Sequence, residues 1–270
     1  MMLQEEKNII IVEHKRLKSL HLKRDVIIDC YLPENITDPS GLSLLIINDG
    51  QDLPKMNFTR LINELNSTKQ LFPVLFIGVY AGEERMMEYG AAGVPDFKGR
   101  GAAAQSYQNF LLNELIPFLQ KEYNIEGFKM KAIAGFSLGG LSAIDTIWSY
   151  PETFSIAGIF SGSLWWRSKD LNEGYDEATH RIMHKKIREG IYTPGLKFYF
   201  ATGSLDETAD RNGNGIIDSI DDTLDLIEEL KKIGYSGSDI NYVNDYKGKH
   251  DVETWGRAMP CFLLWGWGRK

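Results

Sequence analysis

The chain has little of several things that mark specialised classes of protein. It has only two cysteines in 270 residues, too few for a disulfide framework, and their spacing is not that of a metal site. Cys30 falls in a strand-like run and Cys261 in a helix-like one, so we expect two buried thiols that pack as small apolar groups. A basic run is also absent, and the formal net charge is -7, which argues against nucleic acid or an anionic membrane surface as a partner.

Long hydrophobic runs are missing as well. The first twenty residues carry glutamates where a secretory signal would be positive, and the apolar run at 9–12 is too short for a signal or a membrane span. We therefore expect a cytoplasmic protein, although a chain from which a signal had been removed would look the same. The composition, 43% hydrophobic and 25% charged, is that of an ordinary globular protein. No internal repeat or linker divides the chain, so we expect one domain over residues 1–270.

Apolar strands alternate with amphipathic helices along the whole chain. Most of the strands are continuous apolar runs, which is typical of strands buried on both faces. The pattern predicts an α/β protein with a single, mostly parallel central sheet and helices on both faces. The expected strands are two antiparallel ones within 9–32, then 42–47, 73–80, 132–136, 156–160, 196–202 and 240–246, and the expected helices are 58–65, 107–123, 141–150, 178–188, 221–233 and 252–267.

The segment 129–150 runs from an apolar strand through a tight turn into a helix, with Ser137 at the bend. Residues 135–139 read Gly-Phe-Ser-Leu-Gly, the G-x-S-x-G pattern, in which glycines two before and two after the serine leave room for the turn. A serine there stands exposed above the sheet, and the start of the following helix faces a developing negative charge. Strand, turn and helix occur in the order that the motif requires, so we interpret Ser137 as a nucleophile rather than part of an ordinary turn.

A serine nucleophile needs a base and an orienting acid, and both should follow strand ends. Of the five histidines, only His250 follows an expected strand end in a glycine-containing loop, so we expect it to be the general base. The strand 196–202 leads to Asp206 and Glu207, of which we choose Asp206 as the acid and keep Glu207 in reserve. The chain order serine, aspartate, histidine is that of the α/β-hydrolase arrangement.

The tetrahedral intermediate of such a reaction needs two N–H donors for its oxyanion. One is the backbone N–H of Leu138, directly after the nucleophile. The second should come from the loop after the strand 42–47, where Gln51 is the candidate and Gly50 would allow close approach.

At this point the chain resembles the esterase D-like branch of the α/β hydrolases. The branch includes feruloyl and acetylxylan esterases, enterochelin-type siderophore esterases, S-formylglutathione hydrolases and mycolyltransferases. The resemblance covers nearly the whole chain, implies a serine carboxylic-ester hydrolase with the α/β-hydrolase fold, and supports Asp206, because the family's acid lies three residues after the glycine of its loop. The segments that carry it are 48–51, 135–140, 160–166, 203–206, 248–251 with Trp255, and 260–265.

After the acid, residues 210–221 are an insertion relative to the shortest members of the branch. They carry oxygen ligands at positions 1, 3, 5, 9 and 12 and a glycine at 6, the spacing of an EF-hand-type calcium loop whose position 7 offers a backbone carbonyl. Aspartate replaces the usual glutamate at position 12, which should weaken binding. The alternative is that this loop is a polar turn that caps the next helix. We expect no cofactor for the catalytic reaction itself. The candidate ligands are Asp210, Asn212, Asn214, Ile216, Asp218 and Asp221.

The substrate is less constrained by the sequence. Trp165 and Trp166 follow a strand near the serine and could form an acyl- or aryl-binding wall, or could simply pack in the core. Arg85 could contact substrate or form a surface ion pair. We expect a small-molecule or carbohydrate-linked ester as substrate and hydrolysis through an acyl-enzyme. The alternatives are acyl transfer to a sugar or other alcohol, and a ligand-binding module that has lost catalysis.

Overall fold

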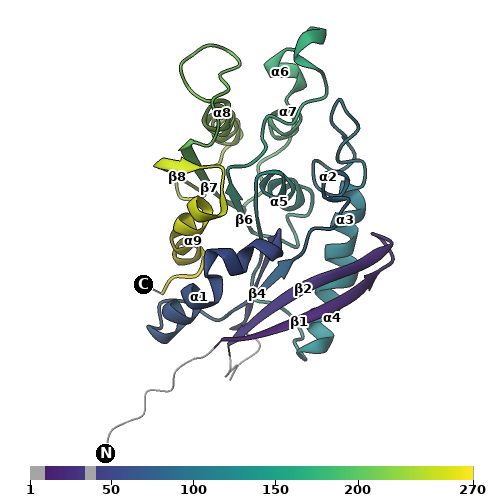
Figure 1. The fold of residues 1–270 in the computed structure, drawn as a ribbon, viewed down its shortest axis with the longest axis vertical. Coiled ribbons are helices and arrows are strands. Elements are labelled where there is room, and N and C mark those ends of the chain that lie inside the picture. The colour runs from purple at the N-terminus through teal and green to yellow at the C-terminus, as the bar shows by residue number, and fades with distance from the viewer. Residues whose placement is uncertain (1–9, 34–40, 270) are drawn as a thin grey trace, which may run out of the picture.

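A computed structural model describes residues 10–33 and 41–269. The first strand is expected to begin at residue 9, which lies outside these residues. Much of the segment that argues against a secretory signal lies outside them as well. In the described part, the strands form one eight-stranded sheet of order β1-β2-β4-β3-β5-β6-β7-β8 (Figure 1). β1, β2 and β4 pair antiparallel, and every pair from β4 through β3 to β8 is parallel. The α/β-hydrolase prediction is confirmed. The strands are β1 (Ile10–Ser19), β2 (Arg24–Pro33), β3 (Ser43–Asn48), β4 (Val74–Val79), β5 (Lys131–Phe136), β6 (Ile156–Phe160), β7 (Lys197–Leu205) and β8 (Ile240–Lys249).

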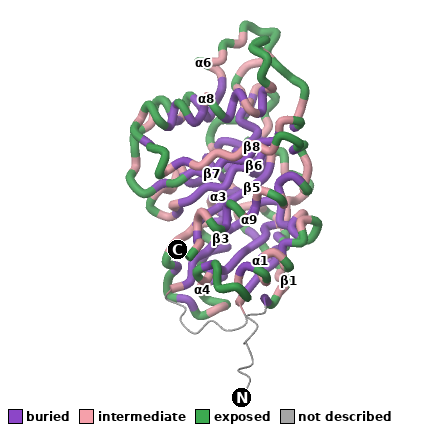
Figure 2. Tube along the Cα trace, turned by 90° about the vertical axis from the view of Figure 1, so that its left-hand side faces the viewer, coloured by how far each residue is buried: buried purple, intermediate pink, exposed green. Residues whose placement is uncertain are grey.

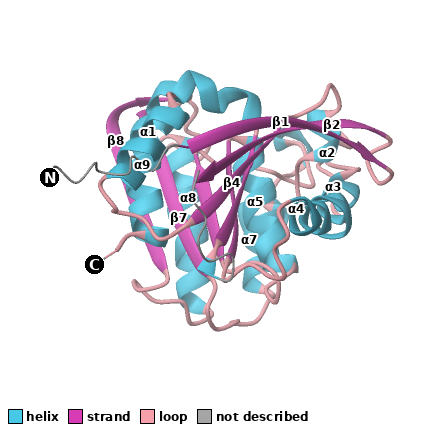
Figure 3. Cartoon of the chain, turned by 90° about the horizontal axis from the view of Figure 1, so that it is seen from below, coloured by secondary structure: helices cyan, strands magenta, loops and turns pink. Residues whose placement is uncertain are grey.

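Helices cover both faces of the sheet because successive side chains of its central strands point to opposite faces. In β3, Leu44 and Ile46 belong to one apolar core, and Leu45 and Ile47 belong to the other. α1 and α9 close the second core, whereas α3, α4, α5, α7 and α8 close the first, and Figure 3 shows α1 and α9 on the opposite side of the sheet from α4 and α5. The helices are η2 (Gly50–Met56), α1 (Phe58–Ser67), α2 (Arg85–Glu88), α3 (Ala104–Phe110), η3 (Leu111–Leu115), α4 (Ile116–Glu122), α5 (Leu138–Ser149), η4 (Leu171–Glu173), α6 (Glu177–His180), α7 (Ile182–Arg188), α8 (Asp218–Lys232) and α9 (Val252–Trp267).

The expected helix 178–188 is interrupted. α6 ends at His180 and α7 begins at Ile182, with Arg181 between them in an extended conformation. The backbone here pairs instead with the segment that follows β6, since Ile182 N–H donates to Trp166 O at 2.9 Å. The break also buries Arg181 against two carboxylates of α8. Tertiary pairing therefore overrides the local helical pattern.

Two strands run further than the sequence predicts. β7 ends at Leu205 and β8 at Lys249, three residues beyond the expected ends of both. They pass closely at Gly203 and Gly248, where a Cβ on Gly203 would lie 2.4 Å from Gly248 O, so a larger residue would force them apart. Asp206 and His250 consequently follow directly after two neighbouring strands.

The inner strands of the sheet form the buried interior of the molecule, whereas the edge strands β1 and β8 are largely exposed or half-buried (Figure 2). Cys30 is buried there in β2 as expected, but Cys261 on α9 is exposed, so the prediction of a second buried thiol is wrong. Cys261 lines an open cavity between α9 and the sheet, which leaves its thiol accessible. Within the described residues, no helix combines the length and the apolar character needed to cross a membrane.

Candidate active site

Ser137 lies between β5 and α5 in a backbone conformation that a non-glycine residue rarely adopts. Its φ is 54° and its ψ is -121°, and its N–H donates to Phe160 O at 2.9 Å. The turn leaves no room at its flanks, because a Cβ on Gly135 would lie 2.3 Å from the backbone of Gly139. Such strain persists only where surrounding structure enforces it, and it is concentrated at functional sites. The glycine spacing therefore has the steric cause expected for the motif.

The Ser137 hydroxyl contacts a second serine. Its Oγ lies 3.3 Å from Ser163 Oγ, and Ser163 N–H donates to Ser137 O at 3.0 Å. In the described residues no hydrogen bond joins Ser137 to His250. The sequence did not indicate Ser163 as a partner of Ser137, although both follow strands that end at the same edge of the sheet.

Asp206 and His250 lie side by side at the ends of β7 and β8. His250 Nδ1 is 3.9 Å from Asp206 Oδ1, with the Asp206 side chain 0% exposed and that of His250 41% exposed. Burial raises the pKa of Asp206 above its ordinary value, against the opposing effects of hydrogen bonds from Gly203 N–H and the Ser161 hydroxyl and of the His250 charge. A carboxylate beside a solvent-accessible imidazole can orient it and stabilise its protonated form. Glu207, the reserve acid, makes no ion pair with His250.

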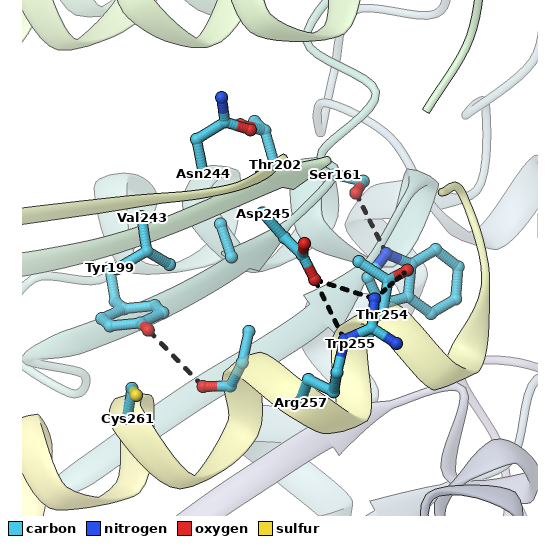
Figure 4. A pocket seen from close by; sticks show the side chains of 12 residues that line it. Ser161, Tyr199, Thr202, Val243, Asn244, Asp245, Thr254, Trp255, Arg257 and Cys261 are labelled. Carbon is cyan, nitrogen blue, oxygen red and sulfur yellow. Dashed lines mark hydrogen bonds and ion pairs between the residues drawn. The ribbon is translucent and has the colours of Figure 1, made fainter. Parts of the chain in front are cut away.

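Trp255, in the first turn of α9, contacts His250 and groups next to Ser137 and Asp206. Its Nε1–H donates to Ser161 Oγ at 3.0 Å (Figure 4). That hydroxyl in turn donates to Asp206 Oδ1 at 3.1 Å. The indole also stacks on Phe136, next to Ser137, at 5.0 Å between ring centroids, and meets the edge of the His250 ring at 5.3 Å. Sequence reasoning did not find the role of Ser161 and Trp255; the only signal was their place in the Phe-Ser-Gly and His-Asp-x-x-x-Trp segments.

A cavity of about 170 Å³ lies between β7, β8 and α9 (Figure 4). Its lining includes Ser161, Trp255 and Cys261 and excludes Ser137 and His250. It therefore lies on the α9 side of the acid, away from the nucleophile.

The two candidate oxyanion donors lie at the starts of helical turns. Leu138 is the first residue of α5, where a backbone N–H has no partner within the helix. Gln51 is the second residue of η2, and its side chain is already engaged, since its Oε1 accepts from Ala81 N–H at 3.0 Å. Asn48 ties the two segments together, because its Nδ2 donates to Gly139 O at 2.8 Å.

The expected roles of Gly50 and Arg85 change in the structure. Gly50 is required by packing on β4, since a Cβ there would lie 2.3 Å from the Gly78 backbone, and this is a reason other than approach to substrate. Arg85 forms a two-point ion pair with Asp49, at 2.6 Å from Nε and 2.8 Å from Nη2. Its guanidinium is therefore already neutralised, which corresponds to the ion-pair alternative and leaves Arg85 poorly suited to contact substrate.

The two tryptophans after β6 differ in exposure. Trp166 is fully buried, and a Cβ on Gly90 or on Gly101 would lie 3.1 Å from its ring, so it packs beneath the loop 90–101 and does not form a substrate wall. Trp165 is half-buried and carries the Arg100 guanidinium 5.2 Å from its ring centroid. Trp165 thus remains a candidate substrate contact.

The candidate calcium loop is folded back on the start of α8. Asp210 accepts N–H bonds from Asn214 and Gly215 at 3.1 and 2.9 Å, and Asp221 accepts the side-chain amides of Asn212 and Asn214 at 2.7 and 3.0 Å. A half-turn of both amides would direct their oxygens toward the position that a cation would share with Asp221. Two further candidate ligand residues already have partners within the protein. Ile216 N–H donates to Asn214 Oδ1, and Asp218 is paired with Arg211 at 3.2 Å. Among the described residues, no three His, Cys, Asp or Glu side chains gather closely enough to hold a metal ion.

Comparison with known proteins places this geometry in a family. A family model described as "Putative esterase" matches residues 19–265. The chain is 30% identical over 246 residues, covering 89% of this chain and 92% of the relative, to the uncharacterized protein YbbA of Bacillus subtilis. Among solved structures, a ferulic acid esterase superposes with a TM-score of 0.69 at 16% identity, covering 95% of this chain and 97% of that one. The enterobactin esterase FES of Shigella flexneri superposes with a TM-score of 0.71 at 18% identity, covering 97% of this chain and 62% of that one. The chain belongs to this esterase family and is a carboxylic-ester hydrolase.

Proposed function

We propose that the protein is a serine esterase that works through an acyl-enzyme, with Ser137 as nucleophile, His250 as general base and Asp206 as the orienting acid. The observation that carries this proposal is the pairing of a buried carboxylate with an accessible imidazole at the ends of β7 and β8, on the same edge of the sheet as the strained serine turn. Membership of the esterase family supports the reaction class.

In the acylation half of this mechanism, Ser137 Oγ attacks the ester carbonyl carbon while its proton passes to His250 Nε2. The carbonyl electron pair moves onto oxygen, where the N–H groups of Leu138 and Gln51 stabilise the negative charge. The intermediate then collapses, the C–O bond to the alcohol breaks, and the imidazolium donates its proton to the departing oxygen. Asp206 stabilises the imidazolium while it exists.

In the deacylation half, water attacks the acyl-Ser137 carbonyl and gives its proton to His250. Collapse of the second intermediate breaks the bond to Ser137 Oγ, which regains its proton from the imidazolium and releases the acid. An alcohol attacking in place of water would give acyl transfer, and product analysis with an added alcohol distinguishes the two outcomes.

The mechanism requires a small adjustment of the site. The gap of 3.9 Å between Nδ1 and Oδ1 must shorten to hydrogen-bond length, and Ser137 Oγ must turn from Ser163 toward the imidazole. Catalytic hydrogen bonds are often long in a free enzyme and tighten when substrate binds. The exposed His250 ring packs edge-on against Trp255 and has room to move on its open side.

Covalent labelling tests the proposal directly. A fluorophosphonate is expected to phosphonylate one serine of the native protein, with loss of fluoride, and to abolish hydrolysis of short-chain p-nitrophenyl esters. Peptide mapping by mass spectrometry should place the adduct on Ser137. An active enzyme that is not labelled, or that is labelled elsewhere, would exclude Ser137 as the nucleophile, and a protein with neither activity nor label would support the non-catalytic alternative.

We further propose that the loop 210–221 binds a structural Ca²⁺ through the oxygens of Asp210, Asn212, Asn214, Asp218 and Asp221 and the carbonyl of Ile216. The ligand spacing and the convergence of two asparagine amides on Asp221 support this, and the loop must contract and release Asp218 from Arg211 for all six groups to reach one ion. Because the loop directly follows Asp206, a bound ion would stiffen the acid's surroundings.

Chelation tests the calcium proposal. Treatment with EGTA is expected to lower the melting temperature by several degrees, and excess Ca²⁺ should restore it, because a ligand that binds only the folded state stabilises it. The variant Asp210→Ala should lose this response. Asp170→Ala is the matched control, since Asp170 also accepts a backbone N–H in an exposed turn, from Asn172 at 3.0 Å, but lies outside the loop. Identical melting curves with EGTA and with Ca²⁺ would refute the proposal.

A further inference from the structure

Two segments, 80–103 after β4 and 161–181 after β6, pack against each other and carry four arginines. Phe97 N–H donates to Arg167 O at 3.1 Å, which joins the loop 89–101 to the segment 163–181. Three of them have carboxylate partners: Arg85 is paired with Asp49, Arg100 with Asp96, and Arg181 with Asp222 and Asp225. Arg167 has no carboxylate partner among the residues that the structure describes.

The Arg167 guanidinium is enclosed by aromatic rings. Its centre lies 4.9 Å from the ring centroid of Phe97, 5.9 Å from that of Tyr175 and 6.0 Å from that of Trp165. Cation–π contacts of this kind engage the charge of the guanidinium but leave its N–H groups without acceptors. Arg167 Nε is buried without a hydrogen-bond partner in the described part of the chain, and the same holds for the Tyr175 hydroxyl. An arginine enclosed in this way lacks a planar acceptor.

The neighbouring charges are already committed to one another. Arg211, which also lies over Tyr175 at 5.8 Å, is paired with Glu177 and Asp222 at 2.7 Å. Neither of these two carboxylates makes an ion pair with Arg167. Two more cations lie beside rings of this cluster. Arg100, which is paired with Asp96, lies 5.2 Å from the Trp165 ring, and the exposed Lys98 lies 5.4 Å from the Phe97 ring. The cluster therefore favours an incoming anion.

This cluster lies close to the nucleophile along the chain. Ser163, whose hydroxyl is 3.3 Å from Ser137 Oγ, is four residues before Arg167, a span of at most about 14 Å when fully extended. The span is shorter here, because Trp166 N–H donates back to Ser163 O at 3.2 Å. A substrate of moderate size held at Ser137 can therefore reach Arg167.

We propose that Arg167 binds a carboxylate of the ester substrate, with Phe97 and Trp165 packing against an adjacent flat or apolar part of the molecule. The planar fork of a guanidinium matches a carboxylate at two points, and the half-buried setting strengthens that pair. The substrate class is then an ester whose acyl or alcohol part is itself a carboxylic acid. This inference rests on the proposed role of Ser137, because it places the carboxylate relative to that nucleophile.

Matched substrates test the charge preference. One pair is 4-acetoxybenzoate and 4-acetoxybenzamide, with the anion in the alcohol part; the other is mono-4-nitrophenyl suberate and its terminal carboxamide, with the anion in the acyl part. In at least one pair, the wild type is expected to favour the carboxylate by about tenfold or more in kcat/KM. Arg167→Gln should bring that ratio near one, Arg167→Lys should retain part of it, and Arg60→Gln, an exposed arginine on α1, should leave it unchanged.

A binding measurement separates this inference from the proposed chemistry. Ser137→Ala is titrated with each of the two carboxylates, 4-acetoxybenzoate and mono-4-nitrophenyl suberate. At least one of them should show saturable quenching of tryptophan fluorescence from Trp165, at least tenfold weaker when Arg167→Gln is added. Equal kcat/KM within both substrate pairs, an equal loss on both members of a pair in Arg167→Gln, or no saturable quenching would each overturn the inference. Saturable binding in a wild type that hydrolyses no ester would instead refute the role of Ser137 and leave the carboxylate site standing.

Discussion

Replacing Ser137 by alanine is expected to lower kcat/KM for ester hydrolysis by roughly 10⁴- to 10⁶-fold, because the variant lacks the atom that forms the acyl-enzyme. The fold should survive. Alanine is no more strained than serine at a φ of 54°, and the lost contact with Ser163 is a partly exposed hydrogen bond of 3.3 Å. Steady-state kinetics with a short-chain p-nitrophenyl ester, alongside circular dichroism, measure both properties.

Ser163→Ala is the matched control for this result, since it removes the neighbouring hydroxyl and leaves the strained turn intact. Its kcat/KM should fall by less than about tenfold, the cost of one modest hydrogen bond. The fluorophosphonate adduct should still form on Ser137. The reverse outcome, in which Ser163→Ala is inactive and Ser137→Ala is active, would make Ser163 the nucleophile.

Asp206→Asn is expected to lower kcat by about 10⁴-fold and to raise stability at neutral pH. Activity falls because an amide cannot stabilise the imidazolium and holds the imidazole in the wrong tautomer. The existing contacts can be kept, since the asparagine oxygen can accept from Gly203 N–H and its amide can donate to Ser161 Oγ. Glu207→Gln is the matched control, because it removes the next carboxyl along the chain, and it should retain activity within a few-fold.

The stability change follows from the direction of the pKa shift. Burial raises the pKa of Asp206 in the folded state above its value in the unfolded chain, near 3.9. The folded protein therefore binds this proton more tightly, so the wild type loses stability as the pH rises from about 4 through the folded-state pKa. The neutral asparagine does not titrate. Thermal melting at several pH values should show Asp206→Asn above the wild type at pH 7, with the difference disappearing below about pH 3. A variant less stable than the wild type at pH 7 would contradict this reasoning.

The sequence by itself determined the class of fold and named the segments that carry the proposed site. Continuous apolar strands that alternate with helices can bury the side chains of both faces only in a sheet that helices cover on both sides. The structure has that sheet. The turn at Ser137 was equally readable, because the steric demand of its two glycines is local to five residues. Asp206 and His250 could be named from their places after strands, although the strands proved to be longer than their apolar runs.

What the sequence left open depends on contacts between distant segments. Arg85, a predicted substrate contact, is neutralised by Asp49, and Trp166 is buried beneath a loop more than sixty residues earlier in the chain. The link from Trp255 through Ser161 to Asp206 joins three segments that follow different strands. Only the tertiary structure decided which arginine kept a carboxylate partner and which did not, because ion pairing depends on distances in space, which local sequence patterns do not encode.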